Sequence, residues 1–229
     1  MPKSQIRIQS FLSNLPIFRD LGDQQIARLA VGTVVLEAPR GAAIYRRGDP
    51  CNGLHAVVYG QIKLSLQTDR GDEMVVELIG HGMSFGEAPL FSGRPHILAA
   101  EALADSKLLH VTKDVLLAEL ERDPRLSQRV IAILSDRLYQ RLGELEGYFL
   151  SSGTERVINY LLRGENGRPA GDFERVTLPA TKGIIASRLN LTHEHFSRIL
   201  RELITAGLIE VDGRDVCILN KKRLYGYAS

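Results

Sequence analysis

The chain has 229 residues, 44% of them hydrophobic, and a formal net charge of +2, so it is long enough for one large domain or two ordinary ones and is unlike a disordered protein. No stretch reaches the apolar length of a membrane helix and the first residues lack the apolar core of a secretion signal, so we expect a cytoplasmic protein with no membrane partner. Two distant cysteines, Cys51 and Cys217, argue against a disulfide framework and cannot alone ligate an iron–sulfur cluster.

A helix is expected over residues 12–31, and short strands separated by glycine turns follow it up to residue 111. The strand-like runs include 33–36, 44–45, 61–66 and 74–79. Strands this short with turns this frequent are typical of an antiparallel roll or barrel. We therefore predict a sensor roll with its N-terminal helix over residues 1–112.

The periodicity becomes helical from Lys113 onward, and residues 113–150 are predicted to form a dimerisation helix region. One apolar stripe recurs at intervals of three and four residues: Ile131, Leu134, Leu138, Leu142, Leu145 and Phe149. The charged residues of this segment, Arg129 and Arg137 among them, are expected on the outer face. The stripe can pack on its own domain or form a coiled-coil seam with a second copy. We favour the dimer because no helix of similar length follows.

The Ser151–Gly153 junction opens the last predicted domain, residues 151–229. Lys and Arg outnumber Asp and Glu by 12 to 9 after residue 150, against 17 to 18 before it. This local excess points to a polyanion or to an ordinary soluble surface, and charge alone does not decide between them. Helices are expected at 155–162, 181–189 and 192–206, with a short strand at 176–178, a cap at Gly207 and a hairpin at 208–219 around Asp212-Gly213. Helix, turn, helix and β-wing in this order predict a winged DNA-binding unit.

The helix expected at 192–206 has two chemically different sides. Phe196, Ile199, Leu200 and Leu203 fall on one side, and Glu194, Ser197, Arg198 and Arg201 on the other. Arg can bind guanine, Glu can accept from cytosine, and Ser can do either, so we predict that Glu194, Ser197 and Arg198 read bases. Contacts with the DNA backbone or flanking positions are predicted for Thr181, Lys182, Arg188, Thr192, His193, His195, Arg201 and Arg214.

His193 and His195 could suggest a metal site. On a helix these two side chains point about 200° apart, so they cannot close on one ion. We therefore predict no metal at this position.

The whole pattern resembles the Crp/Fnr family. The resemblance rests on residues 41–50, 59–64 and 85–87 in the roll and on 156–162, 184–200 and 212–214 in the C-terminal part. It implies an α+β fold: an antiparallel β-roll similar to a cyclic-nucleotide-binding jelly roll, a long dimerisation helix and a winged helix-turn-helix. Glu194-x-x-Ser197-Arg198 resembles the Fnr-type reading signature, which implies a two-fold TTGA-like site with half-sites about 34 Å apart.

The same resemblance implies a homodimeric transcription regulator, not an enzyme. Activation through RNA polymerase is expected, and repression stays possible. A signal bound in or beside the roll would shift the long helix and bring both reading helices onto successive major grooves.

The sensor pocket implied by the family departs from the pattern of cyclic-nucleotide binders. Gly86-Glu87 is present, but the slot for a phosphate-binding Arg-Ser falls near His96-Ile97, with Arg94 close by. Ile cannot hydrogen-bond phosphate, and His is a weak substitute for a guanidinium. We therefore rank cyclic nucleotides below another small-molecule or gas signal and keep a cyclic-nucleotide-dependent, Crp-like regulator as the alternative.

No cysteine precedes Cys51, which excludes an Fnr-type iron–sulfur cluster. Residues 85–96 look most like the Dnr branch, which implies sensing of nitric oxide through haem. The candidate axial ligands are His55, His81, His96, His110 and Cys51. A less favoured alternative is a cupin-type metalloenzyme, which would need several His and carboxylate side chains converging from neighbouring strands.

Overall fold

The structure is a computed structural model that describes residues 8–67, 73–163 and 174–227, without the side chains of 144–150, Arg163 and Glu174. The chain divides into two compact units, Met1–Leu138 and Tyr139–Ser229. Each unit is considered by itself. Within the described residues, no helix combines the length and apolar character needed to cross a membrane.

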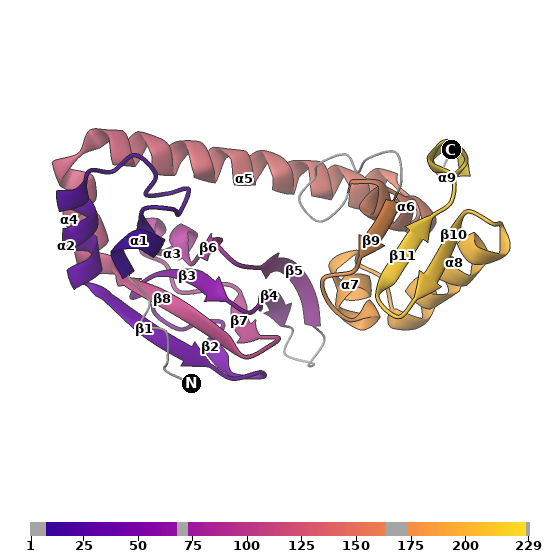
Figure 1. The fold of residues 1–229 in the computed structure, drawn as a ribbon, viewed down its shortest axis with the longest axis horizontal. Coiled ribbons are helices and arrows are strands. Elements are labelled where there is room, and N and C mark those ends of the chain that lie inside the picture. The colour runs from indigo at the N-terminus through magenta and orange to yellow at the C-terminus, as the bar shows by residue number, and fades with distance from the viewer. Residues whose placement is uncertain (1–7, 68–72, 164–173, 228–229) are drawn as a thin grey trace. The chain divides into compact units, whose positions relative to one another are not determined.

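The first unit is built on two antiparallel four-stranded sheets, in the orders β1-β8-β3-β6 and β2-β7-β4-β5 (Figure 1). The strands are β1 Thr33–Ala38, β2 Ala43–Tyr45, β3 Gly53–Tyr59, β4 Ile62–Gln67, β5 Glu73–Ile79, β6 Ser84–Phe85, β7 Ala99–Ala102 and β8 Ser106–Thr112. Apolar side chains from both sheets, including Val57 of β3 and Ile62 of β4, form one buried cluster. The predicted antiparallel roll is therefore confirmed.

The β1-β8-β3-β6 sheet is covered on its second face by helices. These are α1 Ile8–Leu12, α2 Asp23–Val31, α4 Lys113–Arg122 and the start of α5 Pro124–Leu150. Leu29, Leu116 and Leu126 of these helices share a second core with Leu54 of β3 and Leu109 of β8. Because β3 is buried on both faces, it lacks the polar alternation of a one-sided strand.

The single helix expected over residues 12–31 is wrong. The helical residues divide into α1 and α2, with turns between them. Pro16 disfavours helical geometry at Leu15 and removes a backbone donor. In the intervening turns Leu15, Ile17 and Phe18 are all buried. A continuous helix would bury only the side chains on one of its faces.

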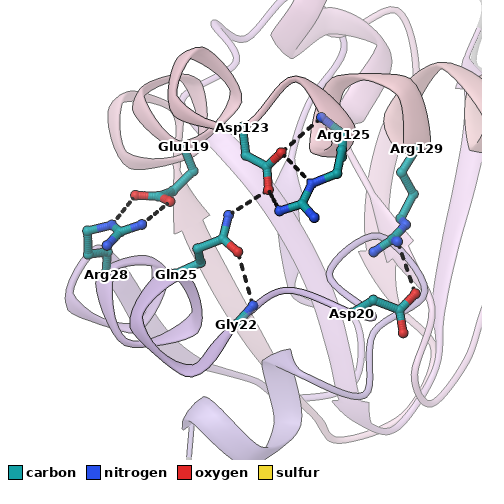
Figure 2. A network of polar contacts seen from close by, with 8 residues as sticks. All are labelled: Asp20, Gly22, Gln25, Arg28, Glu119, Asp123, Arg125 and Arg129. Carbon is teal, nitrogen blue, oxygen red and sulfur yellow. Dashed lines mark hydrogen bonds and ion pairs between the residues drawn. The ribbon is translucent and has the colours of Figure 1, made fainter.

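Charged side chains fix α2 against α4 and the start of α5, as Figure 2 shows. Arg28 of α2 forms two hydrogen bonds with Glu119 of α4, at 2.5 and 2.8 Å. Gln25 donates to Asp123 at 3.1 Å, and Asp123 also accepts from Arg125. These contacts attach the helical layer that the second core stabilises.

The second unit combines helices with a small sheet in the order β10-β11-β9. Its elements are α6 Gly153–Arg163, β9 Glu174–Thr177, α7 Lys182–Arg188, α8 His193–Thr205, β10 Ile209–Asp212, β11 Asp215–Ile218 and α9 Lys221–Tyr227. Asn190, between α7 and α8, has a φ of +54°, a conformation that Asn adopts more readily than most residues. The predicted winged helix-turn-helix is confirmed, and α9 is an addition that the sequence did not predict.

Gly207 ends α8 as its position in the sequence suggested. Its φ is +65°, and its N–H donates to the Ile204 carbonyl at 2.9 Å. The next N–H, of Leu208, donates to the Leu203 carbonyl at 3.0 Å. This pair of bonds closes the helix and directs the chain into β10.

Candidate nucleic-acid interface and sensor cluster

Helix α8 presents a polar strip on the side opposite its buried anchors. Phe196, Ile199, Leu200 and Leu203 are almost fully buried. Glu194, Arg198 and Arg201 are exposed, and Ser197 is half-buried beside them. The structure therefore brings together the side chains that were predicted to read bases.

The first turn of α8 is fixed by its own cap. The Thr192 hydroxyl accepts a hydrogen bond from the His195 N–H at 3.1 Å. The backbone N–H of Glu194 and the Thr192 hydroxyl lower the pKa of the Glu194 carboxyl. Glu194 is therefore an ionised acceptor at neutral pH, at the helix end that the dipole makes favourable for it.

The Arg198 guanidinium is held only loosely by its own helix. Its side chain is 65% exposed, and its Nε lies 3.9 Å from the Glu202 carboxylate one turn later. Exposed ion pairs of this kind contribute little. The guanidinium can therefore exchange this contact for a base edge at small cost.

The side chains predicted to flank the reading strip fall into two groups. Thr181, Thr192, His193, Arg201 and Arg214 are exposed, whereas Lys182, Arg188 and His195 are half-buried. The imidazole of His195 lies against Gly153 at the start of α6, close enough that a Cβ on Gly153 would lie 3.1 Å from it. His195 thus supports the α6 contact, and His193 is the more accessible of the two histidines.

In the roll, Glu87 is buried at the start of α3, Glu87–Ser92. Its carboxylate accepts from the Ser84 hydroxyl at 2.5 Å and from Arg137 of α5 at 2.8 Å. Arg137 also donates to the Ser84 carbonyl at 2.8 Å. The expectation that Arg137 lies on the outer face of the long helix is wrong, because a buried carboxylate needs a charged partner and Arg137 supplies it.

Arg129 corrects the same expectation, since it donates to Asp20 at 3.0 Å and is also directed toward its own unit. The other predicted sensor residues separate. Gly86 lies beside His96, which is buried, whereas Arg94 and Ile97 are exposed.

Three of the histidines named as candidate ligands gather with two aromatic rings. Tyr45 stacks on His96 with ring centroids 3.6 Å apart. His55 lies 4.5 Å from His110 and 5.1 Å from Phe85 between ring centroids. We call these five residues the histidine cluster.

The imidazoles of the histidine cluster are held neutral. Burial, with smaller contributions from His110 and His96, lowers the pKa of His55 to about 3. Burial also lowers the pKa of His96 and of His110. In the part of the chain that the structure describes, Nδ1 of His55 and Nδ1 of His110 are buried without a hydrogen-bond partner.

The remaining candidate ligands lie apart or serve other contacts. The ring of His81 is exposed, with Nδ1 2.5 Å from the Val58 carbonyl and Phe11 at its edge. Cys51 directs its thiol toward the carbonyls of Gly53 and Gly86, both at 3.5 Å. Across the described ranges, no three His, Cys, Asp or Glu side chains are placed to hold a metal ion together.

The apolar stripe of α5, a helix that contains the boundary between the two units, is only partly covered. Ile131, Leu138 and Leu142 are 63%, 59% and 53% exposed, whereas Leu134 packs against the second core. Tyr139, which was not among the predicted stripe residues, is also exposed. The side chains of Leu145 and Phe149 lie outside the described residues. An apolar face therefore remains open along the described part of this helix.

Two family models match the chain. The cyclic nucleotide-binding domain matches residues 35–123, and the Crp-like helix-turn-helix domain matches residues 155–227. The chain is also similar to the CRP-like cAMP-activated global transcriptional regulator of Mycobacterium tuberculosis, with 24% identity over 95% of this chain and 98% of that protein.

Two solved structures extend the likeness. FixK2 from Bradyrhizobium japonicum is 25% identical, with 86% of this chain and 98% of that chain covered and a TM-score of 0.75. DNR from Pseudomonas aeruginosa is 30% identical, with 98% and 99% covered and a TM-score of 0.53.

Proposed function

The chain belongs to the Crp/Fnr family of DNA-binding transcription regulators, and on this premise we propose that it is a homodimer that reads a two-fold, TTGA-like site under the control of a signal received by the roll. The observation that carries the proposal is the exposed strip of α8, where Glu194, Ser197 and Arg198 lie opposite a fully buried apolar side. Activation through RNA polymerase in the cytoplasm is part of the proposal and rests on the family alone.

The side chains of the strip suit major-groove recognition. A recognition helix contacts base edges with residues near its N-terminus, and Glu194, Ser197 and Arg198 occupy the first half of α8. Glu194 can accept from the cytosine amino group, and Arg198 can form paired hydrogen bonds with guanine. A TTGA half-site and its complement contain both bases.

The open apolar face of α5 supports the dimer. Ile131, Leu138 and Leu142 recur at intervals of seven and four residues, and all are more than half exposed. A helix of this kind buries its apolar residues against a second copy in a coiled coil. A two-fold dimer would then present two α8 helices to two half-sites.

Selection of bound sequences from random duplex DNA tests this proposal. We expect enrichment of two inverted TTGA-like half-sites about one helical turn apart, or roughly 34 Å. The selection should be run at stated salt with and without haem and nitric oxide, because phosphate contacts make affinity depend strongly on ionic strength. Enrichment of a direct repeat, a single half-site or no sequence at all would contradict the proposal.

For the signal, we propose haem that binds nitric oxide. Support comes from the 30% identity to DNR over almost the whole chain and from the histidine cluster, whose neutral imidazoles with unpartnered nitrogens suit coordination. Haem would supply an iron that binds the gas. The 3.6 Å stack of Tyr45 on His96 leaves no space for a porphyrin between these rings, so binding would require His96 to leave the stack.

Titration with haemin tests the haem proposal. A Soret shift that His96→Ala or His55→Ala removes would support it, with His81→Ala, a change at an exposed ring outside the cluster, as the control. If all of these variants keep the Soret shift, the substituted histidines are not the haem ligands.

The alternative signal is a cyclic nucleotide, which the match to the cyclic nucleotide-binding domain favours. Against it, the Glu87 carboxylate is engaged by Arg137 and the phosphate slot holds His96 and the exposed Ile97. Calorimetry with cyclic AMP and cyclic GMP decides between haem and a cyclic nucleotide as the signal. Micromolar binding together with a gain of DNA affinity would replace haem in this account.

The proposal assigns no catalysis to the roll. A cupin-type enzyme would need converging metal ligands, and no observation within the described ranges favours such a group. Metal analysis combined with a turnover screen would detect this alternative.

A further inference from the structure

An open surface depression of about 590 Å³, which we call the cavity, lies beside the C-terminal half of α8. Residues from Arg198 to Ala206, in α8 and at its C-terminal end, form one part of its wall, and Tyr227 of α9 forms the other. The lining residues are Arg198, Arg201, Glu202, Thr205, Ala206 and Tyr227. The unpredicted helix α9 therefore shapes the surface next to the reading strip.

The cavity continues the reading strip along the same side of α8. Arg198, Arg201 and Thr205 follow Glu194 at spacings of four, three and four residues, which keeps all four on one side of a helix. The N-terminal half of a recognition helix enters the major groove. The C-terminal half then leaves the groove, where the nearest part of the duplex is its phosphate backbone.

Positive charge is concentrated around this cavity. Arg198 and Arg201 contribute two guanidinium groups to its wall against one carboxylate, Glu202. Arg223 of α9 donates to the Ala206 carbonyl at 3.4 Å, which brings a third guanidinium to the end of α8. Beyond Asp215 the sequence contains Lys221, Lys222 and Arg223 and no acidic residue.

We propose that this cavity binds a backbone phosphate of DNA outside the base-read half-site, so that α9 lengthens the footprint of each protomer. Arg201 supplies charge-assisted hydrogen bonds, and the Tyr227 hydroxyl donates a further one. Because the cavity continues the strip that reads bases, its phosphate belongs to the bound duplex and not to a free nucleotide. This inference rests on the proposed function.

The test compares two duplexes that share the same TTGA-like half-sites. One ends at the half-sites, and the other carries additional base pairs on both sides. Each neutralised phosphate adds about 0.9 to the slope of log affinity against log salt, so the wild-type dimer should show a slope steeper by about two on the longer duplex.

The variant is Tyr227→Glu, which places a negative charge in the cavity, and the matched control is Tyr225→Glu. Tyr225 lies two residues earlier on the same helix, does not line the cavity and is exposed, as is Tyr227. Between 50 and 200 mM salt the wild type should lose about tenfold more affinity for the longer duplex than for the shorter one, whereas the slopes of Tyr227→Glu on the two duplexes should coincide. Tyr225→Glu should keep the wild-type difference.

Equal slopes for the wild type on both duplexes, or equal losses in the two variants, would overturn the inference. A free phosphate source is the remaining outcome: inorganic phosphate or adenosine triphosphate that competes with the short duplex in wild type but not in Tyr227→Glu would also overturn it. Failure to bind even the short duplex would instead reject the proposed function. Thermal unfolding of each variant checks that the fold is kept.

Discussion

His55 shows how strongly one position in the roll departs from an aqueous environment. The residue is 8% exposed, and its ring contacts the rings of Tyr45, Phe85 and His110. Burial lowers the pKa of His55 to about 3. The folded state therefore keeps this imidazole neutral, whereas in the unfolded chain the imidazole is protonated below the ordinary pKa of histidine.

This difference predicts that the roll is destabilised by mild acid. The stability that neutral His55 contributes is complete above pH 6.5 and is lost as the pH falls from 6.5 toward 3, at up to about 1.4 kcal/mol per pH unit. His55→Phe should therefore reduce the change in the free energy of unfolding between pH 7.5 and 5.5, measured by urea denaturation. His81→Phe, at an exposed ring, is the control. An identical pH dependence in wild type and His55→Phe would disprove the assignment.

At the scale of elements, the contact of α2 with α4 depends on Glu119. This carboxylate is 1% exposed and accepts from Arg28 of α2 and from Arg122 of its own helix. The hydrogen bond from Arg28 is the main cause that lowers the pKa of Glu119. Because both arginines are more exposed than the acid, the buried carboxylate is the member whose charge most needs compensation.

Glu119→Gln should lower the free energy of unfolding by about 1–3 kcal/mol, because it removes the charge and leaves Arg28 with one weaker acceptor. Glu121→Gln, an exposed position on the same helix, should change stability by less than about 0.5 kcal/mol. Denaturation in urea at pH 7 measures both. Equal effects of the two substitutions would show that the network in Figure 2 adds no stability.

The elements also show which features sequence patterns can predict. Helices α6, α7 and α8 and the β10–β11 hairpin begin and end within about two residues of expectation, because caps, periodicity and turn residues are local. Strand β3 was not among the runs named, since burial on both faces removes its alternation. The break between α1 and α2 has a local signal in Pro16, whereas the burial of Phe18 in the intervening turns is a tertiary effect that no local pattern contains.

The candidate site divides in the same way. The strip of α8 follows from helical spacing alone, so Glu194 and Arg198 could be placed from the sequence. The partnership of Arg137 with Glu87 joins residues 50 positions apart, and a charged residue on a helix is ordinarily expected in solvent. Helix α9 was missed because its seven residues give too short a pattern.

In the whole molecule, recognition of a two-fold site requires two copies of the chain. Leu138→Glu with Leu142→Glu would place charge on the exposed apolar face of α5, so we expect monomers in sedimentation velocity and loss of tight binding to a two-fold site. Gln140→Glu, exposed on the same helix, adds charge elsewhere and should leave the dimer intact. A dimer that survives the double substitution would place the interface on another surface.

Affinity measurements with Arg198→Ala determine whether the exposed strip of α8 reads DNA sequence. We expect the variant to lose about 1–3 kcal/mol of discrimination between the selected site and a scrambled duplex. Arg201→Ala should instead weaken binding to both duplexes by a similar factor, as loss of a backbone contact does. An unchanged ratio of the two affinities in Arg198→Ala would contradict the claim.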